Sequence, residues 1–236
     1  MQSTLGEFQE TQSEQPFALQ NSKLLKVSLD QVTIQAQAGS MVAYQGDVAF
    51  EHAGSGGLSR MMKKAVTGEG TKLMRMSGTG EVFLAHTAQE IHLLYLENDA
   101  LTVNGENLLA FDAGIDWDIR RVEGVSGFMG GGLFNMALTG TGWVAVVSDG
   151  PPVLLNTGEA PTFADPQAAI TWASSVKTGI KTDIKLKNLI GRGSGESVQM
   201  SFWGPGWVLV QPSEGGVAGG TPSGGGAGGL LSSLGG

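Results

Sequence analysis

The sequence predicts an all-β protein, a sandwich or barrel. Short runs of apolar, β-branched and aromatic residues recur at regular spacing, with glycine pairs beside them. Helical periodicity is nearly absent, and its best instance is Leu58–Val66. The 38 glycines among 236 residues follow no Gly-X-Y period, so a collagen-like chain is excluded.

Composition and charge exclude several classes of protein. With 41% hydrophobic and 15% charged residues, the chain can bury a substantial core, which excludes wholesale disorder. The absence of cysteine excludes disulfides, thiolate metal sites and a cysteine nucleophile. A net charge of −8 means that a nucleic-acid surface would need strong local segregation of charge. No signal peptide or membrane span is recognisable, so we expect a cytoplasmic protein.

Three segments of the chain resemble one another, at residues 77–84, 139–146 and 203–210. Each contains a Gly-X-Gly motif and then a short run of strand composition. Apolar strand candidates precede them at residues 40–44, 107–111 and 168–172, and glycine-rich excursions separate the two elements at residues 54–70, 124–132 and 191–195. Because glycine permits positive φ, Gly-X-Gly at a strand start predicts a bulge or a sharp corner.

The spacing of these elements predicts the domain organisation. One unit alone is too small to bury a core, so we expect three to pack around a pseudo-threefold axis. The predicted parts are a polar N-terminal segment (1–15), one β domain (16–212) with repeats at about 20–90, 91–155 and 156–212, and a flexible Gly/Ser-rich tail (213–236).

Several of these motifs, in this order, resemble the mitochondrial-biogenesis family named for altered inheritance of mitochondria. They are Ala38–Ala43, Ser77–Leu84, Leu108–Asp112, Gly132–Phe134 with Thr139–Gly142, and Arg192–Glu196 followed by Gly204–Gly206. The resemblance covers most of residues 20–212. It implies a fold similar to the tryptophan RNA-binding attenuator protein (TRAP), a double-stranded β-helix-like arrangement duplicated within one chain. It implies no catalytic residues, and the acidic N-terminus fits a bacterial-type member better than an imported one.

Candidate groups for catalysis or metal binding lack partners in the sequence. His86 and His92, six residues apart, would lie about 20 Å apart on one strand, too far to share a metal ion. Asp116, Asp118 and Arg120 alternate as on an exposed strand face. Gly191–Gly195 is an ordinary turn or a weak anion cradle. We therefore predict no enzyme activity, no cofactor and no metal.

Basic residues form a second candidate site. Lys181, Lys185 and Lys187 alternate with apolar residues, which predicts a half-buried strand that shows a basic row to water, with Arg192 beyond it. Such a row binds phosphate-rich partners or lipid head groups, or it protects a sheet edge from aggregation. No aromatic residues interleave with these lysines, which argues against RNA binding.

Apolar residues in the glycine-rich loops give the strongest functional indication. In one loop Met61 and Met62 accompany the basic residues Arg60, Lys63 and Lys64, and in the other Phe128, Met129 and Phe134 surround a run of three glycines. Flexible apolar groups on loops suit a protein or membrane contact, or they fold back to plug the barrel. The leading hypothesis is a non-enzymatic, self-associating interaction or scaffold protein with a second copy or another protein as partner. The alternatives are peripheral membrane association and binding of a small ligand or RNA.

Overall fold

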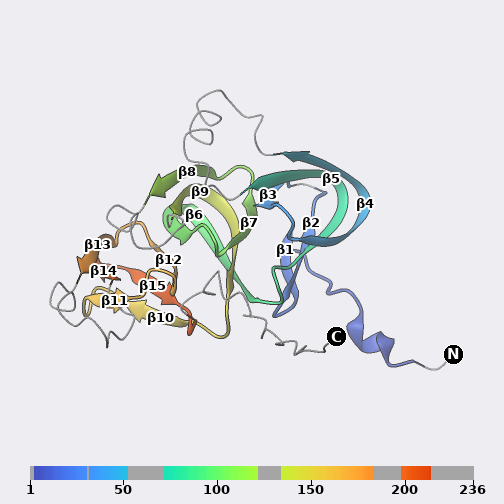
Figure 1. Ribbon diagram of the computed structural model, residues 1–236. Coiled ribbons are helices and arrows are strands. Elements are labelled where there is room, and N and C mark those ends of the chain that lie inside the picture. Colours follow the sequence, from blue (N-terminus) through green and yellow to red (C-terminus); the bar gives the residue numbers. More distant parts are fainter. Residues whose placement is uncertain (1–2, 31, 53–71, 122–133, 183–197, 214–236) are drawn as a thin grey trace, which may run out of the picture.

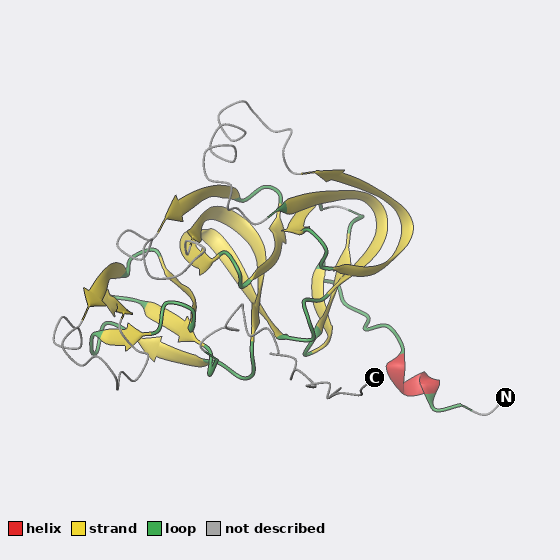
Figure 2. Cartoon of the chain, in the orientation of Figure 1, coloured by secondary structure: helices red, strands yellow, loops and turns green. Residues whose placement is uncertain are grey.

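The structure, a computed structural model, describes residues 3–30, 32–52, 72–121, 134–182 and 198–213. Its regular structure consists almost entirely of strands (Figure 2), and a short 3-10 helix, Leu5–Phe8, precedes them. The predicted all-β class is confirmed. Among these residues no helix is long and apolar enough to cross a membrane.

The strands occupy the following ranges. They are β1 (Phe17–Asn21), β2 (Leu24–Ser28), β3 (Ile34–Gln37), β4 (Met41–His52), β5 (Leu73–Leu84), β6 (Glu90–Asn104), β7 (Leu108–Asp112), β8 (Asp116–Arg121), β9 (Phe134–Ser148), β10 (Val153–Asn156), β11 (Thr162–Ala164), β12 (Ala169–Ala173), β13 (Lys177–Thr182), β14 (Val198–Trp203) and β15 (Trp207–Val210). The strand candidates at 40–44, 107–111 and 168–172 are confirmed as parts of β4, β7 and β12.

The strands form two antiparallel sheets. The larger runs in the order β1-β2-β5-β3-β7-β9-β6-β12-β15-β10, with β4 added beside β5 and β8 beside β9. The smaller has the order β11-β14-β13. In Figure 1 the chain progresses from β1–β5 on the right, through β6–β9, to β10–β15 on the left.

Besides the long pairing of β6 with β9, three antiparallel ladders share a common design. The first ladder pairs β4 with β5, the second pairs β7 and β8 with β9, and the third pairs β12 and β13 with β15 and β14. In the second ladder Phe111 lies opposite Val144 and Asp116 lies opposite Thr139, so the register continues unchanged across the corner between β7 and β8. The third ladder does the same from Trp172 opposite Val208 to Lys177 opposite Trp203.

Each ladder begins with a β-bulge at the same place. The register shifts fall between Met41 and Ala43, between Leu108 and Ala110, and between Ala169 and Thr171. A bulge leaves one residue outside the regular pairing and bends the strand. The bulge residues are Val42, Leu109 and Ile170.

The Gly-X-Gly motifs do not all start strands, which corrects the prediction. Gly78 and Gly80 lie inside β5, and Gly140 and Gly142 lie inside β9; the third motif, Gly204–Gly206, forms the turn between β14 and β15. All six glycines have positive φ, and the second of each pair has a φ of 148°. A β-carbon on Gly80 would overlap the carbonyl oxygen of Gln45. Close backbone approach therefore explains the glycines of the first motif, whereas at Gly142 and Gly206 the atoms nearest a β-carbon belong to the side chains of Asp112 and Val176.

The hydrophobic core consists of three clusters, and two of them receive a side chain from the next ladder. Leu109 of β7 is fully buried in the first cluster, among residues of β2, β3 and β5. Ile170 of β12 is fully buried in the second cluster, among residues of β6, β7 and β9. The third cluster comprises Ala164, Ala169, Trp172, Val176, Met200, Phe202 and Val208. The bulge residue of one ladder thus fills the core of the preceding one.

Candidate interaction surface

Most of the predicted contact residues lie outside the described residues. These are Arg60, Met61, Met62, Lys63, Lys64, Phe128, Met129, Lys185, Lys187 and Arg192. The candidate helix at Leu58–Val66 and the anion cradle at Gly191–Gly195 also lie there. The structure therefore places two predicted residues, Phe134 and Lys181, and leaves the loop hypotheses as predictions.

Phe134, the first residue of β9, packs inward. It is half-buried against the second core cluster. A β-carbon on Gly105 would overlap its ring. The backbone N–H of Gly105 also donates to the carbonyl oxygen of Phe134, at 3.0 Å. Only glycine at position 105, in the turn between β6 and β7, leaves room for the Phe134 ring.

Lys181 lies exposed on β13, and its ammonium group sits over an aromatic ring. The Nζ atom is 4.7 Å from the ring centroid of Phe163 on β11, across the intervening β14. Such a cation–π contact at an exposed site contributes about 0.5–1 kcal/mol. The lysine therefore covers part of a ring that would otherwise face water.

Exposed aromatic and aliphatic side chains gather on strands at the ends of the sheets. On β4, Val42 is 59% and Tyr44 50% exposed, and the Tyr44 ring contacts Phe50 edge-on at 5.1 Å between centroids. On β11, Phe163 is 49% exposed. In the described pairing, β4 bonds only to β5 and β11 only to β14, so each has an open edge. Open edges with apolar side chains are sites of strand addition.

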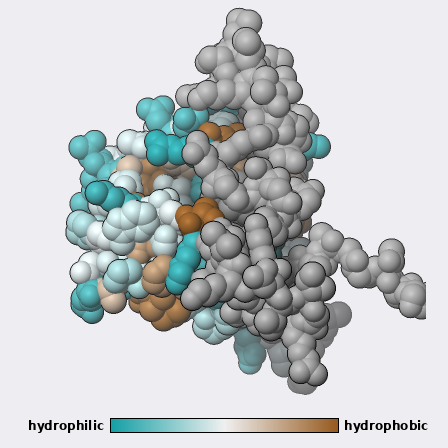
Figure 3. Space-filling model, turned by 60° about the vertical axis from the view of Figure 1, so that its left-hand side comes forward, coloured by the Kyte–Doolittle hydropathy of each residue, from teal (hydrophilic) through white to brown (hydrophobic). Residues whose placement is uncertain are grey.

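β10 provides another apolar edge. It ends the larger sheet, and its Val153 and Leu154 are both largely exposed. Figure 3 turns this side of the molecule forward, and brown, hydrophobic residues reach the surface there between hydrophilic ones. The sequence reasoning missed all of these edge residues, because it assigned the strands to a core and sought contact residues in the loops.

Two grooves lie beside the third ladder. One, of about 310 Å³, is lined by Leu155, Phe163, Ala164, Ala168 and Val210 among others. The other, of about 480 Å³, lies between the second and third ladders, and Arg120, Trp172, Ile180 and Met200 contribute to its walls. The first groove borders the third core cluster on the side of β11. Its lining also includes Asp165, Gln199, Gln211 and Ser213, so the groove has apolar and polar walls.

The histidines do not form a shared site in the described part of the chain. His86 precedes β6 in a turn, so the prediction that it shares a strand with His92 is wrong. Nε2 of His92 hydrogen-bonds the Ser148 hydroxyl at 2.7 Å. Burial lowers the pKa of His92, and the nearby Glu90 carboxylate only partly opposes this. Among the described residues, no three histidine or carboxylate side chains gather as metal ligands would.

Asp112 acts on the backbone beside the second Gly-X-Gly motif. Its Oδ2 accepts a hydrogen bond of 2.6 Å from the backbone N–H of Trp143. Burial raises the pKa of Asp112, and the hydrogen bond from Trp143 works against this rise. Asp116 and Asp118 lie on β8, as predicted, and each already has an interaction partner. These carboxylates therefore have structural roles that need no substrate.

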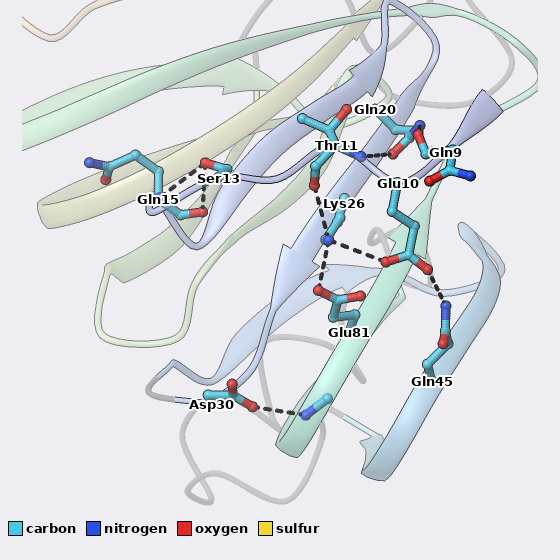
Figure 4. A network of polar contacts seen from close by, with 11 residues as sticks. Gln9, Glu10, Thr11, Ser13, Gln15, Gln20, Lys26, Asp30, Gln45 and Glu81 are labelled. Atoms are coloured by element: carbon cyan, nitrogen blue, oxygen red, sulfur yellow. Dashed lines mark hydrogen bonds and ion pairs between the residues drawn. The ribbon is translucent and has the colours of Figure 1, made fainter. Parts of the chain in front are cut away.

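A buried lysine joins the N-terminal segment to the sheet (Figure 4). Nζ of Lys26 lies 2.7 Å from a carboxylate oxygen of Glu81 and 3.4 Å from one of Glu10, and it donates to the carbonyl oxygen of Thr11 at 3.0 Å. Burial alone would lower the pKa of Lys26, but the two carboxylates outweigh it and raise that pKa. Glu10 also accepts a hydrogen bond from the Gln45 amide on β4.

Comparison with known proteins places the chain in a family. The structure is similar to the crystal structure of protein SPYM3_0169 from Streptococcus pyogenes, with a TM-score of 0.65 and 23% identity over 83% of this chain and 91% of that one. This likeness shows the fold alone. No curated protein matches the sequence. Residues 17–213 match the family described as mitochondrial biogenesis AIM24, and the chain belongs to that family.

Proposed function

We propose that the protein is a non-enzymatic interaction or scaffold protein that associates with copies of itself. The observation that carries this proposal is the set of half-exposed apolar side chains on open strand edges, with Val42 and Tyr44 on β4 and Phe163 on β11. Exposed apolar groups on an edge favour association because burying them removes apolar surface from water, at about 25 cal/mol per Å².

The proposed architecture consists of three equivalent TRAP-like units in an open succession, because β4 and β11, at its two ends, do not pair with each other in the described chain. Its support is the shared design of the ladders, which have a bulge at the same point and a Gly-X-Gly motif at matching positions. In such an array each unit contacts its neighbours, and the two terminal units keep one unmatched face each. We expect a second copy of the chain to bind at such an unmatched face.

The remaining chemistry fits an interaction role better than catalysis. Three groups described above have shifted pKa values and bond within the fold: His92 to Ser148, Asp112 to the backbone of Trp143, and Lys26 to Glu81 and Glu10. A catalytic group, by contrast, faces a cleft together with a second titratable group. The membrane and nucleic-acid alternatives depend on the loop residues and lysines that lie outside the described residues.

Sedimentation velocity and native mass spectrometry of the full chain test the proposal. We expect a mass above that of the 24.4 kDa chain, falling as the protein is diluted. A co-purification from cell extract, with tagged and untagged copies expressed together, should recover the untagged copy. A monomer at every concentration, with no untagged copy recovered, would contradict self-association.

A further inference from the structure

Two junctions inside the chain join neighbouring ladders, and they share one register. In the first, β3 pairs antiparallel with β7, and Gln35 lies opposite Phe111. In the second, β6 pairs antiparallel with β12, and Thr102 lies opposite Trp172. Phe111 and Trp172 also hold the same position in their ladders, because each lies opposite the valine second after its Gly-X-Gly motif, Val144 or Val208.

The same correspondence identifies the two halves of a third junction. Tyr44 lies opposite Val82, the valine second after the first Gly-X-Gly motif, so β4 corresponds to β7 and β12. Thr162 of β11 lies opposite Phe202, two residues before Gly204. Ile34 and Leu101 likewise lie opposite Met76 and Leu138, two residues before Gly78 and Gly140. β11 therefore corresponds to β3 and to the second half of β6.

These two halves do not meet within the described chain. β11 bonds only to β14, and β4 bonds only to β5. Figure 1 places them at opposite ends of the molecule, β11 at the lower left and β4 at the right. Residues that are buried in the internal junctions are exposed here: Phe111 and Trp172 are at most 4% exposed, whereas the corresponding Tyr44 is 50% exposed.

The bulge residues show the same contrast. Leu109 and Ile170 are fully buried in the core of the preceding ladder. Val42, the corresponding residue of β4, is 59% exposed. Beside β11, where a bulge residue of a following ladder would enter, the structure has the groove of about 310 Å³ lined by Phe163, Ala164 and Val210. Val42 therefore lacks a core to pack into, and the groove beside β11 lacks the side chain that would fill it. The two features lie at opposite ends of the molecule.

We propose that β4 of a second copy pairs antiparallel with β11, with Val42 in this groove and Tyr44 directly opposite Phe163. The register repeats the two internal junctions, so Ala43 lies opposite Ala164 and Gln45 opposite Thr162. This inference rests on the proposed self-association and adds its surface and geometry. Aromatic residues directly opposite each other in an antiparallel pair stabilise the pairing.

The contact joins two different surfaces, so it is heterologous. A head-to-tail contact of this kind leaves one free β4 and one free β11 on every open assembly, and it ends only when a ring closes. The proposal therefore gives a ring or a filament rather than an isolated twofold dimer.

Cysteine cross-linking tests the register without background, because the chain contains no cysteine. Tyr44→Cys and Phe163→Cys are prepared separately, mixed, and treated with a mild oxidant or a short bis-maleimide. We expect a cross-linked dimer from the mixture and none from either variant alone. Val153→Cys, exposed on β10, replaces Phe163→Cys in the control mixture and should give no dimer. Cross-linking of Tyr44→Cys with itself would show a symmetric contact and overturn the proposal.

Disruption gives an independent measurement. Val42→Asp puts a carboxylate into a groove that holds Phe163, Ala164 and Asp165, and we expect at least a tenfold weaker self-association by sedimentation velocity. Val153→Asp is the matched control, since Val153 is also about half exposed and lies outside the proposed contact. A cross-link formed within one chain of the Tyr44→Cys/Phe163→Cys double variant would also overturn the proposal, because the two edges would then close on each other.

The outcomes separate this inference from the proposed function. A wild-type chain that remains monomeric at all concentrations contradicts both. A wild-type assembly that Val42→Asp leaves intact, and whose mixed cysteine variants do not cross-link, contradicts only the β4–β11 junction. Self-association would then run through another surface, with β10 the first to examine.

Discussion

The paired glycines of β9 allow a sharp test of why the ladders need glycine. Gly140 and Gly142 both have positive φ, at 136° and 148°. Their surroundings differ. A β-carbon on Gly140 would have its nearest neighbour at 3.7 Å, whereas one on Gly142 would come within 2.6 Å of Oδ2 of Asp112. Alanine at Gly140 therefore adds backbone strain alone, and alanine at Gly142 adds strain and a collision.

The expected magnitudes follow from these two contributions. Strain at such a φ costs about 1–3 kcal/mol, and a smaller unfolded-state entropy returns about 0.4–1 kcal/mol. At Gly142 the Asp112 carboxylate must also move, which removes its 2.6 Å hydrogen bond from Trp143. A hydrogen bond to a charged group contributes about 1.5–3 kcal/mol. We expect Gly142→Ala to lower the free energy of unfolding by about 2 kcal/mol more than Gly140→Ala does.

Equilibrium urea unfolding of the two variants measures this difference. Gly114→Ala is the control, since a β-carbon there meets nothing within 4 Å and φ is not positive; it should lie within about 0.5 kcal/mol of wild type. Equal losses at Gly140 and Gly142 would refute the argument from close approach. A loss at neither position would refute the argument from φ as well.

Three further predictions concern ionisable groups. Burial lowers the pKa of His92 in the folded chain, so near the ordinary histidine pKa of 6.5 the unfolded chain binds more protons. The free energy of unfolding should therefore fall as the pH drops through that value. His92→Gln should reduce this pH dependence in urea unfolding. Burial raises the pKa of Asp112, so above the ordinary value of 3.8 the folded chain keeps the Asp112 proton at a pH where the unfolded chain has lost it. The free energy of unfolding should therefore fall as the pH rises above 3.8, and Asp112→Asn should remove this fall. Lys26→Met should detach the N-terminal segment from Glu81, and faster amide exchange around Thr11 would show it. Unchanged pH profiles or exchange rates would contradict the respective assignments.

The sequence was sufficient to predict the short strands, but not their continuation. Residues 107–111 and 168–172 are apolar and bounded by turn residues, so local preference and tertiary structure agree there. β6 runs from Glu90 to Asn104 through a polar stretch that local preference would break. It continues because Asn98 adopts a φ of 51° at a register shift opposite the Gly-X-Gly motif of β9. That partnership is a long-range property.

The exposed edge residues could not be predicted from the local sequence, for a related reason. Val42, Leu109 and Ile170 are all aliphatic and all occupy the bulge of their ladder. Leu109 and Ile170 are buried in the cores of the preceding ladders, whereas in the described residues no ladder precedes that of Val42, which is exposed. The residues next to Val42 in the sequence do not indicate that its side chain is exposed. The resemblance of residues 77–84, 139–146 and 203–210 can be seen in the sequence, and under the proposal above the first and last units carry the unmatched faces.

Corresponding positions also allow folding and assembly to be separated. Phe111 is fully buried and Tyr44 is half exposed, although both lie at the same place in their ladders. Phe111→Ala should therefore cost about 3–5 kcal/mol of unfolding free energy, as for other buried phenylalanines. Tyr44→Thr replaces one residue type that favours strands by another at an exposed position, and it should stay within about 0.5 kcal/mol of wild type in dilute monomer. In concentrated protein, the same Tyr44→Thr chain should sediment as a smaller species than wild type. If Tyr44→Thr unfolds as readily as Phe111→Ala, the β4 edge belongs to the core of the monomer, and the unmatched-face argument fails.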